Sequence, residues 1–351
     1  MEICMRMMFL VLFFFLSSVL GQDTIFPAII AFGDSGTDVG NNNHRQTPFK
    51  SNFFPYGENF ANHEATGRFT DGKTLLDLTA ETLGFVSPPV AYLSPEASGK
   101  NLRFGASFAT AGTGYYDKTS TANEAIPLSQ QLRIFVEYKD KLEKTVGKNQ
   151  TETIMSEALF LLTAGIADFI QNYYFYPDVR KEHTLDSFSK LLLGLLSSFV
   201  KKLHDLGARR IGVTNLSPLG CLPGTRTLLK FKGLNCDEQI NQDAVFFNRE
   251  LNATVDSLKK ELSGLKMIAF DIYEPLLDLV SSPAKYGMAE SRRTCCQTGR
   301  DGGKASVLCR RKLPRVCANS SAHVFFDAVH LSEAANKMMS GALLIQGISL
   351  L

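Results

Sequence analysis

The sequence predicts an α/β protein built on a parallel sheet. Short apolar runs alternate along the chain with longer segments that have the 3.6-residue periodicity of amphipathic helices. This alternation is typical of βαβ units, in which helices cover both faces of a parallel sheet. Hydrophobic residues make up 44% and charged residues 21% of the 351 positions, a balance that allows a large buried core.

The apolar runs give five expected strands, at 28–32, 102–108, 159–163, 210–214 and 267–270. Helical periodicity is clearest in three segments, at 185–203, 237–264 and 332–344. Gly207 follows the first helix and Gly264 ends the second, and glycine is common at helix C-termini. No repeat, low-complexity linker or run of charge marks a boundary, so residues 22–351 are expected to form one domain.

Residues 1–21 are expected to be a cleavable secretory signal. Arg6 precedes an apolar run at 7–16, and small residues lead to a cleavage position after Gly21. The run is short for a bilayer span, so a membrane anchor is the less favoured alternative. No later stretch is apolar enough to span a membrane, and the mature protein is expected to be secreted and soluble, without an integral membrane segment.

The cysteines agree with an oxidising, extracellular route. Beyond the signal the chain has an even number of them: Cys221, Cys236, Cys295, Cys296, Cys309 and Cys317. Adjacent cysteines rarely bond to each other, so Cys295 and Cys296 are each expected to pair elsewhere, with the connectivity open. Zinc is the weaker reading because no pair has the two-residue ligand spacing. We expect no metal and no cofactor, and we expect glycans at three sequons, Asn149, Asn252 and Asn319.

The charge distribution argues against nucleic acid as a partner. The formal net charge is only +2, so the chain has no global basic field. Basic residues do gather near the cysteines, at Arg292, Arg293, Arg300, Lys304, Arg310, Arg311, Lys312 and Arg315. A solvated loop is the simpler interpretation, and binding to an anionic surface such as acidic cell-wall polysaccharide is the alternative.

Ser35 is the candidate nucleophile. In a parallel sheet, ligand chemistry gathers beyond the carboxyl ends of the strands, so the segments at 33–35, 109–114, 165–168 and 215–221 are expected to share one rim. Ser35 follows the first strand within a Gly-Asp-Ser-Gly turn, where its hydroxyl would face a substrate and its N–H an oxyanion. The alternative is that Asp34 and Ser35 only cap the next helix or turn.

Asp327 and His330 are the candidate partners of this serine. A serine hydroxyl needs a general base, and the base needs a group that orients it. The three-residue spacing lets one turn place the carboxylate beside the imidazole, so that Asp327 holds Nδ1–H and Nε2 is free to accept the Ser35 proton. Without Asp327, His330 would be read as a surface histidine near a helix start.

Seven segments together resemble a known family. They read FGDSGTDVGNNN at 32–43, GRFTDGK at 67–73, FGASFATAGTGYYD at 104–117, LTAGIADF at 162–169, PLGCLP at 218–223, TCCQTG at 294–299 and FFDAVHLSEAANK at 325–337. In this order the chain resembles the plant-type GDSL esterase/lipases of the SGNH hydrolase superfamily over nearly all of its mature length. The resemblance implies a three-layer α/β/α fold with a flavodoxin-like parallel sheet and a triad of Ser35, Asp327 and His330.

The resemblance also implies an oxyanion hole formed by Ser35 and a glycine of the ATAGTG segment. Gly114 is the favoured donor and Gly112 the second choice. In that family an asparagine side chain completes the hole, but this chain has Ala167 at the matching position, which cannot donate from its side chain. Losing one such donor typically costs about 10²–10³ in turnover. A slow enzyme, substitution by Asn41 or Asn43, and loss of hydrolysis are the three explanations.

The expected function is hydrolysis of carboxylic esters, lipid or other, through an acyl-enzyme. An acyltransferase using the same triad is one alternative. A weakly active or non-catalytic binding protein is the other, because of Ala167. The aromatic run that follows, Phe169 and the residues at 173–176, is expected to pack a long loop onto the domain; a wall for an acyl pocket is the functional alternative.

Overall fold

The computed structural model describes residues 24–230, 233–301, 304–312 and 315–351, so the predicted signal at 1–21 lies outside the described residues. Six strands form one sheet in the order β2 (Val90–Ala91), β3 (Gly105–Ser107), β1 (Ile29–Gly33), β4 (Leu159–Thr163), β5 (Arg210–Thr214) and β6 (Lys266–Phe270). Every neighbouring pair is parallel, which confirms the predicted class of sheet.

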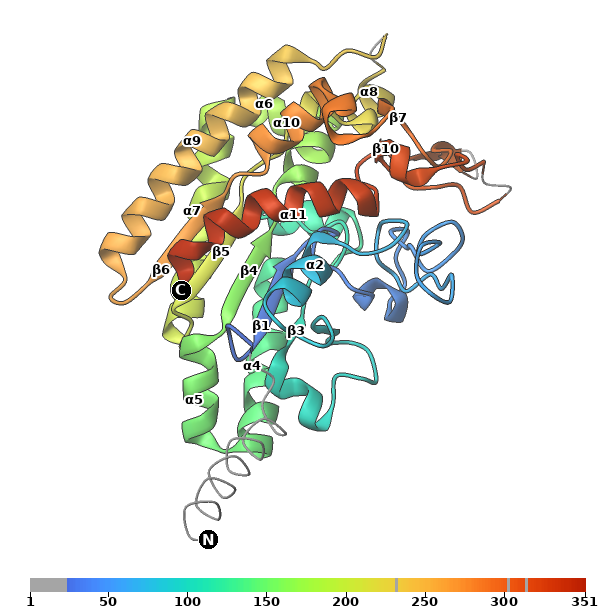
Figure 1. Ribbon diagram of the computed structural model, residues 1–351. Coiled ribbons are helices and arrows are strands. Elements are labelled where there is room, and N and C mark those ends of the chain that lie inside the picture. Colours follow the sequence, from blue (N-terminus) through green and yellow to red (C-terminus); the bar gives the residue numbers. More distant parts are fainter. Residues whose placement is uncertain (1–23, 231–232, 302–303, 313–314) are drawn as a thin grey trace, which may run out of the picture.

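Helices cover both faces of this sheet, so the three-layer α/β/α arrangement is confirmed. One face packs on α4 (Leu128–Val146), α5 (Lys148–Glu157), α7 (Leu185–Asp205) and α9 (Glu238–Glu261), and the other on α2 (Leu75–Thr82) and α11 (Glu333–Gly347). Figure 1 shows α11 crossing the near face of the sheet. No described helix is long and apolar enough to cross a membrane.

Shorter elements complete the described chain. The remaining α-helices are α3 (Asp117–Ala122), α6 (Pro177–Glu182), α8 (Pro223–Leu229) and α10 (Tyr273–Ser281), and η3 (Asp168–Phe175) is a π-helix. The 3₁₀ helices are η1 (Asn41–His44), η2 (Gly99–Phe104), η4 (Leu219–Cys221), η5 (Pro283–Tyr286), η6 (Ser320–Ala322) and η7 (Ile348–Leu350). The strands outside the main sheet are β7 (Glu290–Thr294), β8 (Gly299–Asp301), β9 (Lys304–Ser306) and β10 (His323–Phe325).

Alternating side chains divide the core between the two faces of the sheet. Ile30 and Phe32 of β1 join the larger cluster, which includes the inner faces of α4, α7 and α9. Ile29 and Ala31 point the opposite way and join the cluster of α2 and η7. This division follows from the two-residue period of a strand, since successive side chains of β1 leave opposite faces of the sheet.

The sequence-based elements match the structure unevenly. The strands predicted at 159–163 and 210–214 have the observed bounds, but 102–108 was too long, because residues 99–104 form η2 and only Gly105–Ser107 pair with β1. Gly207 and Gly264 adopt the positive φ angles, 111° and 73°, expected just after a helix. The three disulfides are Cys221–Cys236, Cys295–Cys317 and Cys296–Cys309, so the two adjacent cysteines do pair elsewhere.

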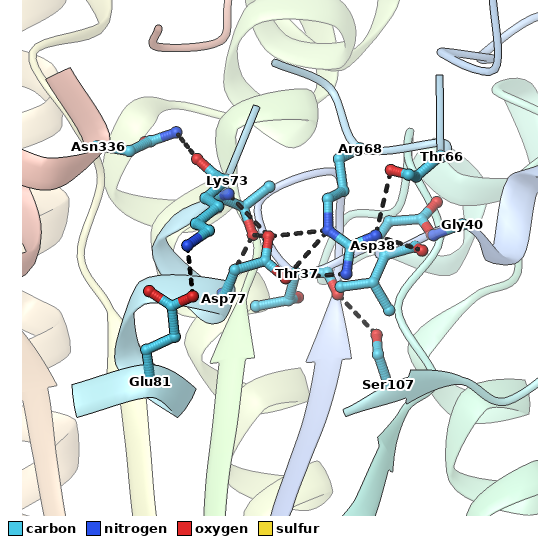
Figure 2. Close-up of polar contacts among 12 residues, drawn as sticks. Thr37, Asp38, Gly40, Thr66, Arg68, Lys73, Asp77, Glu81, Ser107 and Asn336 are labelled. Carbon is cyan, nitrogen blue, oxygen red and sulfur yellow. Dashed lines mark hydrogen bonds and ion pairs between the residues drawn. The ribbon is translucent and has the colours of Figure 1, made fainter. Parts of the chain in front are cut away.

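Buried hydrogen bonds and an ion pair hold α2 against the loop that follows β1 (Figure 2). The Thr74 hydroxyl accepts from the Asp77 N–H and the Asp77 carboxylate accepts from the Thr74 N–H, so α2 begins with a capping box. Arg68 donates to both carboxylate oxygens of Asp77, from Nε at 2.8 Å and from Nη2 at 2.8 Å. The pair is nearly buried, and removing one member of such a pair typically costs about 3–5 kcal/mol.

Candidate active site

The turn after β1 holds Ser35 at the carboxyl edge of the sheet. Gly33 has φ +113°, and a Cβ there would lie 1.7 Å from the carbonyl oxygen of Thr163, so only glycine fits against the neighbouring strand. Asp34 then fixes the turn, because its Oδ1 accepts from the Gly36 N–H at 3.0 Å and from the Thr163 hydroxyl at 2.8 Å. Burial raises the pKa of Asp34 despite these bonds.

A second turn brings Asp327 and His330 to the same edge. Asp327 is fully buried, and its Oδ1 accepts from the N–H groups of Val329 and His330 at 2.9 and 2.8 Å. The His330 Nδ1 lies 2.8 Å from Asp327 Oδ2, and Nε2 lies 2.7 Å from the Ser35 hydroxyl oxygen. The three residues singled out in the sequence therefore form one continuous chain of hydrogen bonds across 295 positions.

Tyr56 is a site residue that the sequence did not reveal. Its hydroxyl donates to Asp327 Oδ2 at 2.7 Å and accepts from the Cys309 N–H at 3.0 Å. Burial, together with the nearby Asp327 charge, raises the pKa of Tyr56 well above its usual value, so the phenol stays a donor. No local pattern could have indicated this contact, because Tyr56 and Asp327 are 271 residues apart.

The two candidate glycines differ in what their N–H groups contact. The Gly114 N–H donates to the Ser120 hydroxyl at 3.1 Å inside the protein. Gly112 is partly exposed, has φ +92°, and its carbonyl accepts from the Asn123 side chain at 2.8 Å. Within the described residues, neither the Gly112 N–H nor the Ser35 N–H has an acceptor. Gly114, the donor favoured from the sequence, thus has an internal acceptor for its N–H, whereas Gly112, the second choice, has none among the described residues.

A buried carboxylate fixes the loop that carries these glycines. Asp168 has no exposed surface and accepts from the N–H groups of Tyr115 and Tyr116 at 2.6 and 3.2 Å. Burial raises the pKa of Asp168 to about 7, because a charged carboxylate is disfavoured away from water. Asp168 follows Ala167 directly, so the segment still anchors the loop although Ala167 lacks a donor.

Neither asparagine proposed as a substitute donor is directed at the site. Asn41 is buried, and its amide nitrogen donates to the carbonyls of Ser107 and Ala109, both at 2.8 Å. The amide nitrogen of Asn43 donates to the Thr66 carbonyl, also at 2.8 Å. These bonds hold the loops together, so substitution by Asn41 or Asn43 is not supported.

The aromatic run after Asp168 has a packing role. Phe169 and Tyr173 are buried against Phe188, with ring centroids 5.8 and 5.2 Å away. Phe175 and Tyr176 are exposed. None of these rings is among the residues that line the cavity bordered by Ser35 and His330, so the contacts favour the packing role expected for the run.

The three sequon asparagines are all exposed. Asn149 lies on α5, Asn252 lies on α9, and Asn319 precedes η6. Glycosylation requires an accessible asparagine, and the exposure of these three side chains is compatible with glycans on the outer surface.

Comparisons with known proteins show the family to which the chain belongs. A sequence model described as GDSL-like Lipase/Acylhydrolase matches residues 29–343. The chain belongs to this family. It is 51% identical to the GDSL esterase/lipase APG of Arabidopsis thaliana, over 93% of this chain and 92% of that protein. It is 49% identical to the Arabidopsis GDSL esterase/lipase At5g03810, over 100% of this chain and 99% of the relative.

Among solved structures, the chain is similar to Axe2, an acetylxylan esterase from Geobacillus stearothermophilus. The likeness has 12% sequence identity and a TM-score of 0.41, and it covers 93% of this chain and 97% of that one. As a member of the GDSL family with close esterase/lipase relatives, this chain is a carboxylic ester hydrolase.

Replacing Tyr56 by phenylalanine is expected to lower kcat for a short ester by roughly ten- to a hundredfold while KM changes less than twofold. The reason is that a hydrogen bond to a charged group, worth about 1.5–3 kcal/mol, no longer holds Asp327 in place behind His330. Steady-state kinetics on p-nitrophenyl butyrate measures both constants.

Tyr138→Phe is the matched control for this prediction. Tyr138 is equally buried, and its hydroxyl donates to the Leu102 carbonyl at 2.7 Å, away from the site. Both variants lose one buried hydrogen bond, but only Tyr56→Phe should lose activity. Equal kcat values in Tyr56→Phe and Tyr138→Phe would show that Tyr56 has no positioning role.

Proposed function

We propose that this chain is a secreted serine esterase that cleaves lipid or other acyl esters through an acyl-enzyme on Ser35. The observation that supports the proposal most directly is the unbroken contact from the Ser35 hydroxyl through His330 to Asp327, at 2.7 and 2.8 Å. This order matches the chemical need for a nucleophile, a base and a group that orients the base.

The geometry supports the following steps. The Ser35 hydroxyl oxygen attacks the ester carbonyl carbon while its proton passes to His330 Nε2. When the tetrahedral intermediate collapses, the bond to the alcohol oxygen breaks and the alcohol leaves with the proton from His330. Water then attacks the acyl group on Ser35, again through His330, and the carboxylic acid is released. Asp327 holds the imidazole and stabilises its charged form during both steps.

The oxyanion would be bound by backbone donors. The Ser35 N–H and the Gly112 N–H are the two candidates, since neither has an acceptor in the described part of the chain. Preorganised N–H donors of this kind stabilise charge that develops on the carbonyl oxygen. With Ala167 in place of an asparagine, we propose that the hole has two donors rather than three and that the enzyme is correspondingly slow.

Secretion is supported by the N-terminal sequence and by the disulfides. Residues 1–21 have the layout of a secretory signal, and three disulfides are typical of proteins that mature in an oxidising compartment. Glycans at Asn149, Asn252 and Asn319 belong to the same proposal.

Labelling by a fluorophosphonate probe tests the nucleophile and separates catalysis from mere binding. We expect the wild-type protein to be labelled, and both Ser35→Ala and His330→Ala to remain unlabelled. Ser198→Ala is the control, because Ser198 is an exposed serine on α7 whose hydroxyl bonds within its own helix. Labelling of Ser35→Ala at the wild-type rate would refute the assignment, and a wild-type protein that never labels would favour a binding role.

Restoring the missing side-chain donor should raise the rate. We expect Ala167→Asn to increase turnover of a short p-nitrophenyl ester, by up to roughly 10²-fold, without changing the order of preferred substrates. Ala167→Leu serves as a control for added bulk without a donor. Equal turnover in the wild type and Ala167→Asn would mean that the oxyanion hole is not short of a donor.

A further inference from the structure

A long apolar cavity extends away from Ser35 across the face of the sheet that α2 and α11 cover. Its volume is about 430 Å³. Ser35, His330 and Thr163 lie at one end, and Leu159, Ile348 and Leu351 are among the residues that line its other parts. The cavity is therefore continuous with the candidate active site and does not form a separate pocket.

The secondary structure gives the length of this cavity. Thr163, Leu161 and Leu159 all line it from β4, and the four steps along the strand from Leu159 to Thr163 span about 13 Å. Asn336, Ser340, Leu343 and Gly347 line it from α11, and the eleven steps along the helix from Asn336 to Gly347 span about 16 Å. An extended hydrocarbon chain advances about 1.25 Å per carbon, so either wall accommodates about ten to thirteen carbons.

The walls have the chemistry of a hydrocarbon site. Among the described residues that line the cavity, the charged or titratable side chains are Asp34 and His330, both at the Ser35 end. Farther along, the lining includes leucines of β4, α2 and α11 and Phe270, together with uncharged polar side chains such as Thr79, Thr82 and Ser340. A chain of methylenes buried there would lose contact with water, and this transfer favours binding of a hydrocarbon chain.

Two glycines shape the far part of the cavity. Gly212 of β5 lines it, and a Cβ there would lie 2.2 Å from the Phe270 ring, so glycine makes room for that ring. At Gly347 a Cβ would reach the same ring at an ordinary 3.6 Å, which leaves room for a side chain that the sequence does not supply. Protein interiors are normally filled at these positions, because an unfilled cavity forfeits dispersion contacts.

Polar contacts set the spacing of the two helices near Ser35. Figure 2 shows Asn336 of α11 directed at Lys73, whose carbonyl accepts from the Asn336 amide at 3.0 Å. The Glu333 N–H donates to Asp71 Oδ1 at 2.7 Å. Together with the Arg68–Asp77 pair, these bonds hold the start of α11 and the start of α2 in place, so the cavity between them is preformed.

We propose that this cavity binds the acyl chain of the ester substrate, with its carbonyl at Ser35, and that the enzyme prefers acyl chains of about ten carbons or more. The inference rests on the proposed role of Ser35 as nucleophile. The exposed side chains of Ile25, Leu344 and Ile348 also line the cavity, so chains longer than the cavity can continue outward among them.

A series of p-nitrophenyl esters with acyl chains of two to sixteen carbons tests the preference. We expect kcat/KM to rise by up to about fourfold per methylene and to level off once the cavity is filled, near ten to thirteen carbons. A flat series, or a decline beyond four carbons, would overturn the proposal. Loss of two-carbon hydrolysis in Ser35→Ala shows independently that the nucleophile is correct.

Two substitutions on α11 should shorten the cavity to different depths. Ser340→Trp fills it about 10 Å closer to the start of α11 than Gly347→Trp does. We therefore expect Ser340→Trp to lose the long esters first, with a cut-off about eight carbons shorter than in Gly347→Trp. Met338→Trp is the control, because Met338 is exposed on the same helix and does not line the cavity. The same cut-off in all three variants would contradict the proposal.

Tryptophan fluorescence gives a readout that does not depend on activity. The chain contains no tryptophan, so each variant carries a single emitting residue. A brominated sixteen-carbon fatty acid should quench Gly347→Trp strongly and Met338→Trp weakly. If esters of acetic acid with long-chain alcohols, rather than long acyl esters, are the substrates lost in Ser340→Trp, the cavity binds the alcohol and the proposal is wrong.

Discussion

The buried carboxylate of Asp327 is the constraint on which the site depends. A charge with no exposed surface is tolerated only when donors surround it, and Asp327 has four: two backbone N–H groups, His330 Nδ1 and the Tyr56 hydroxyl. Tyr56 also accepts from the Cys309 N–H. Hydrogen bonds around Asp327 therefore connect the segment after β1, which contains Tyr56, the disulfide-bonded segment, which contains Cys309, and the turn before α11. These three parts of the chain must meet for His330 to face Ser35.

Much of this arrangement was predictable because it depends on local patterns. Short apolar runs predicted β4 and β5, and the three-residue spacing of Asp327 and His330 indicated a carboxylate beside an imidazole. Other features depend on tertiary contacts that no spacing encodes. The sequence favoured Gly114 over Gly112 because it does not show that the Gly114 N–H bonds to the Ser120 hydroxyl. Nor does it show that Tyr56 reaches Asp327, because that contact forms only in the folded chain.

The two faces of the sheet serve different purposes. The face under α4, α7 and α9 is filled by large side chains such as Phe135 and Phe160 and forms the main core. The opposite face is covered by α2 and α11, and it contains the cavity that Ser35 borders. The two faces can differ because successive side chains of a strand point to opposite faces of the sheet. On β1, Ile30 and Phe32 join the main core, and the strand ends in the turn that carries Ser35.

We propose that Asp327 fixes the tautomer and orientation of His330 for attack by Ser35. Asp327→Asn tests it most directly, because the amide keeps the size of the side chain but changes its hydrogen bond to Nδ1. We expect kcat/KM for a short ester to fall by about 10⁴-fold while circular dichroism shows an intact fold. A fall of less than tenfold in a folded variant would contradict this account.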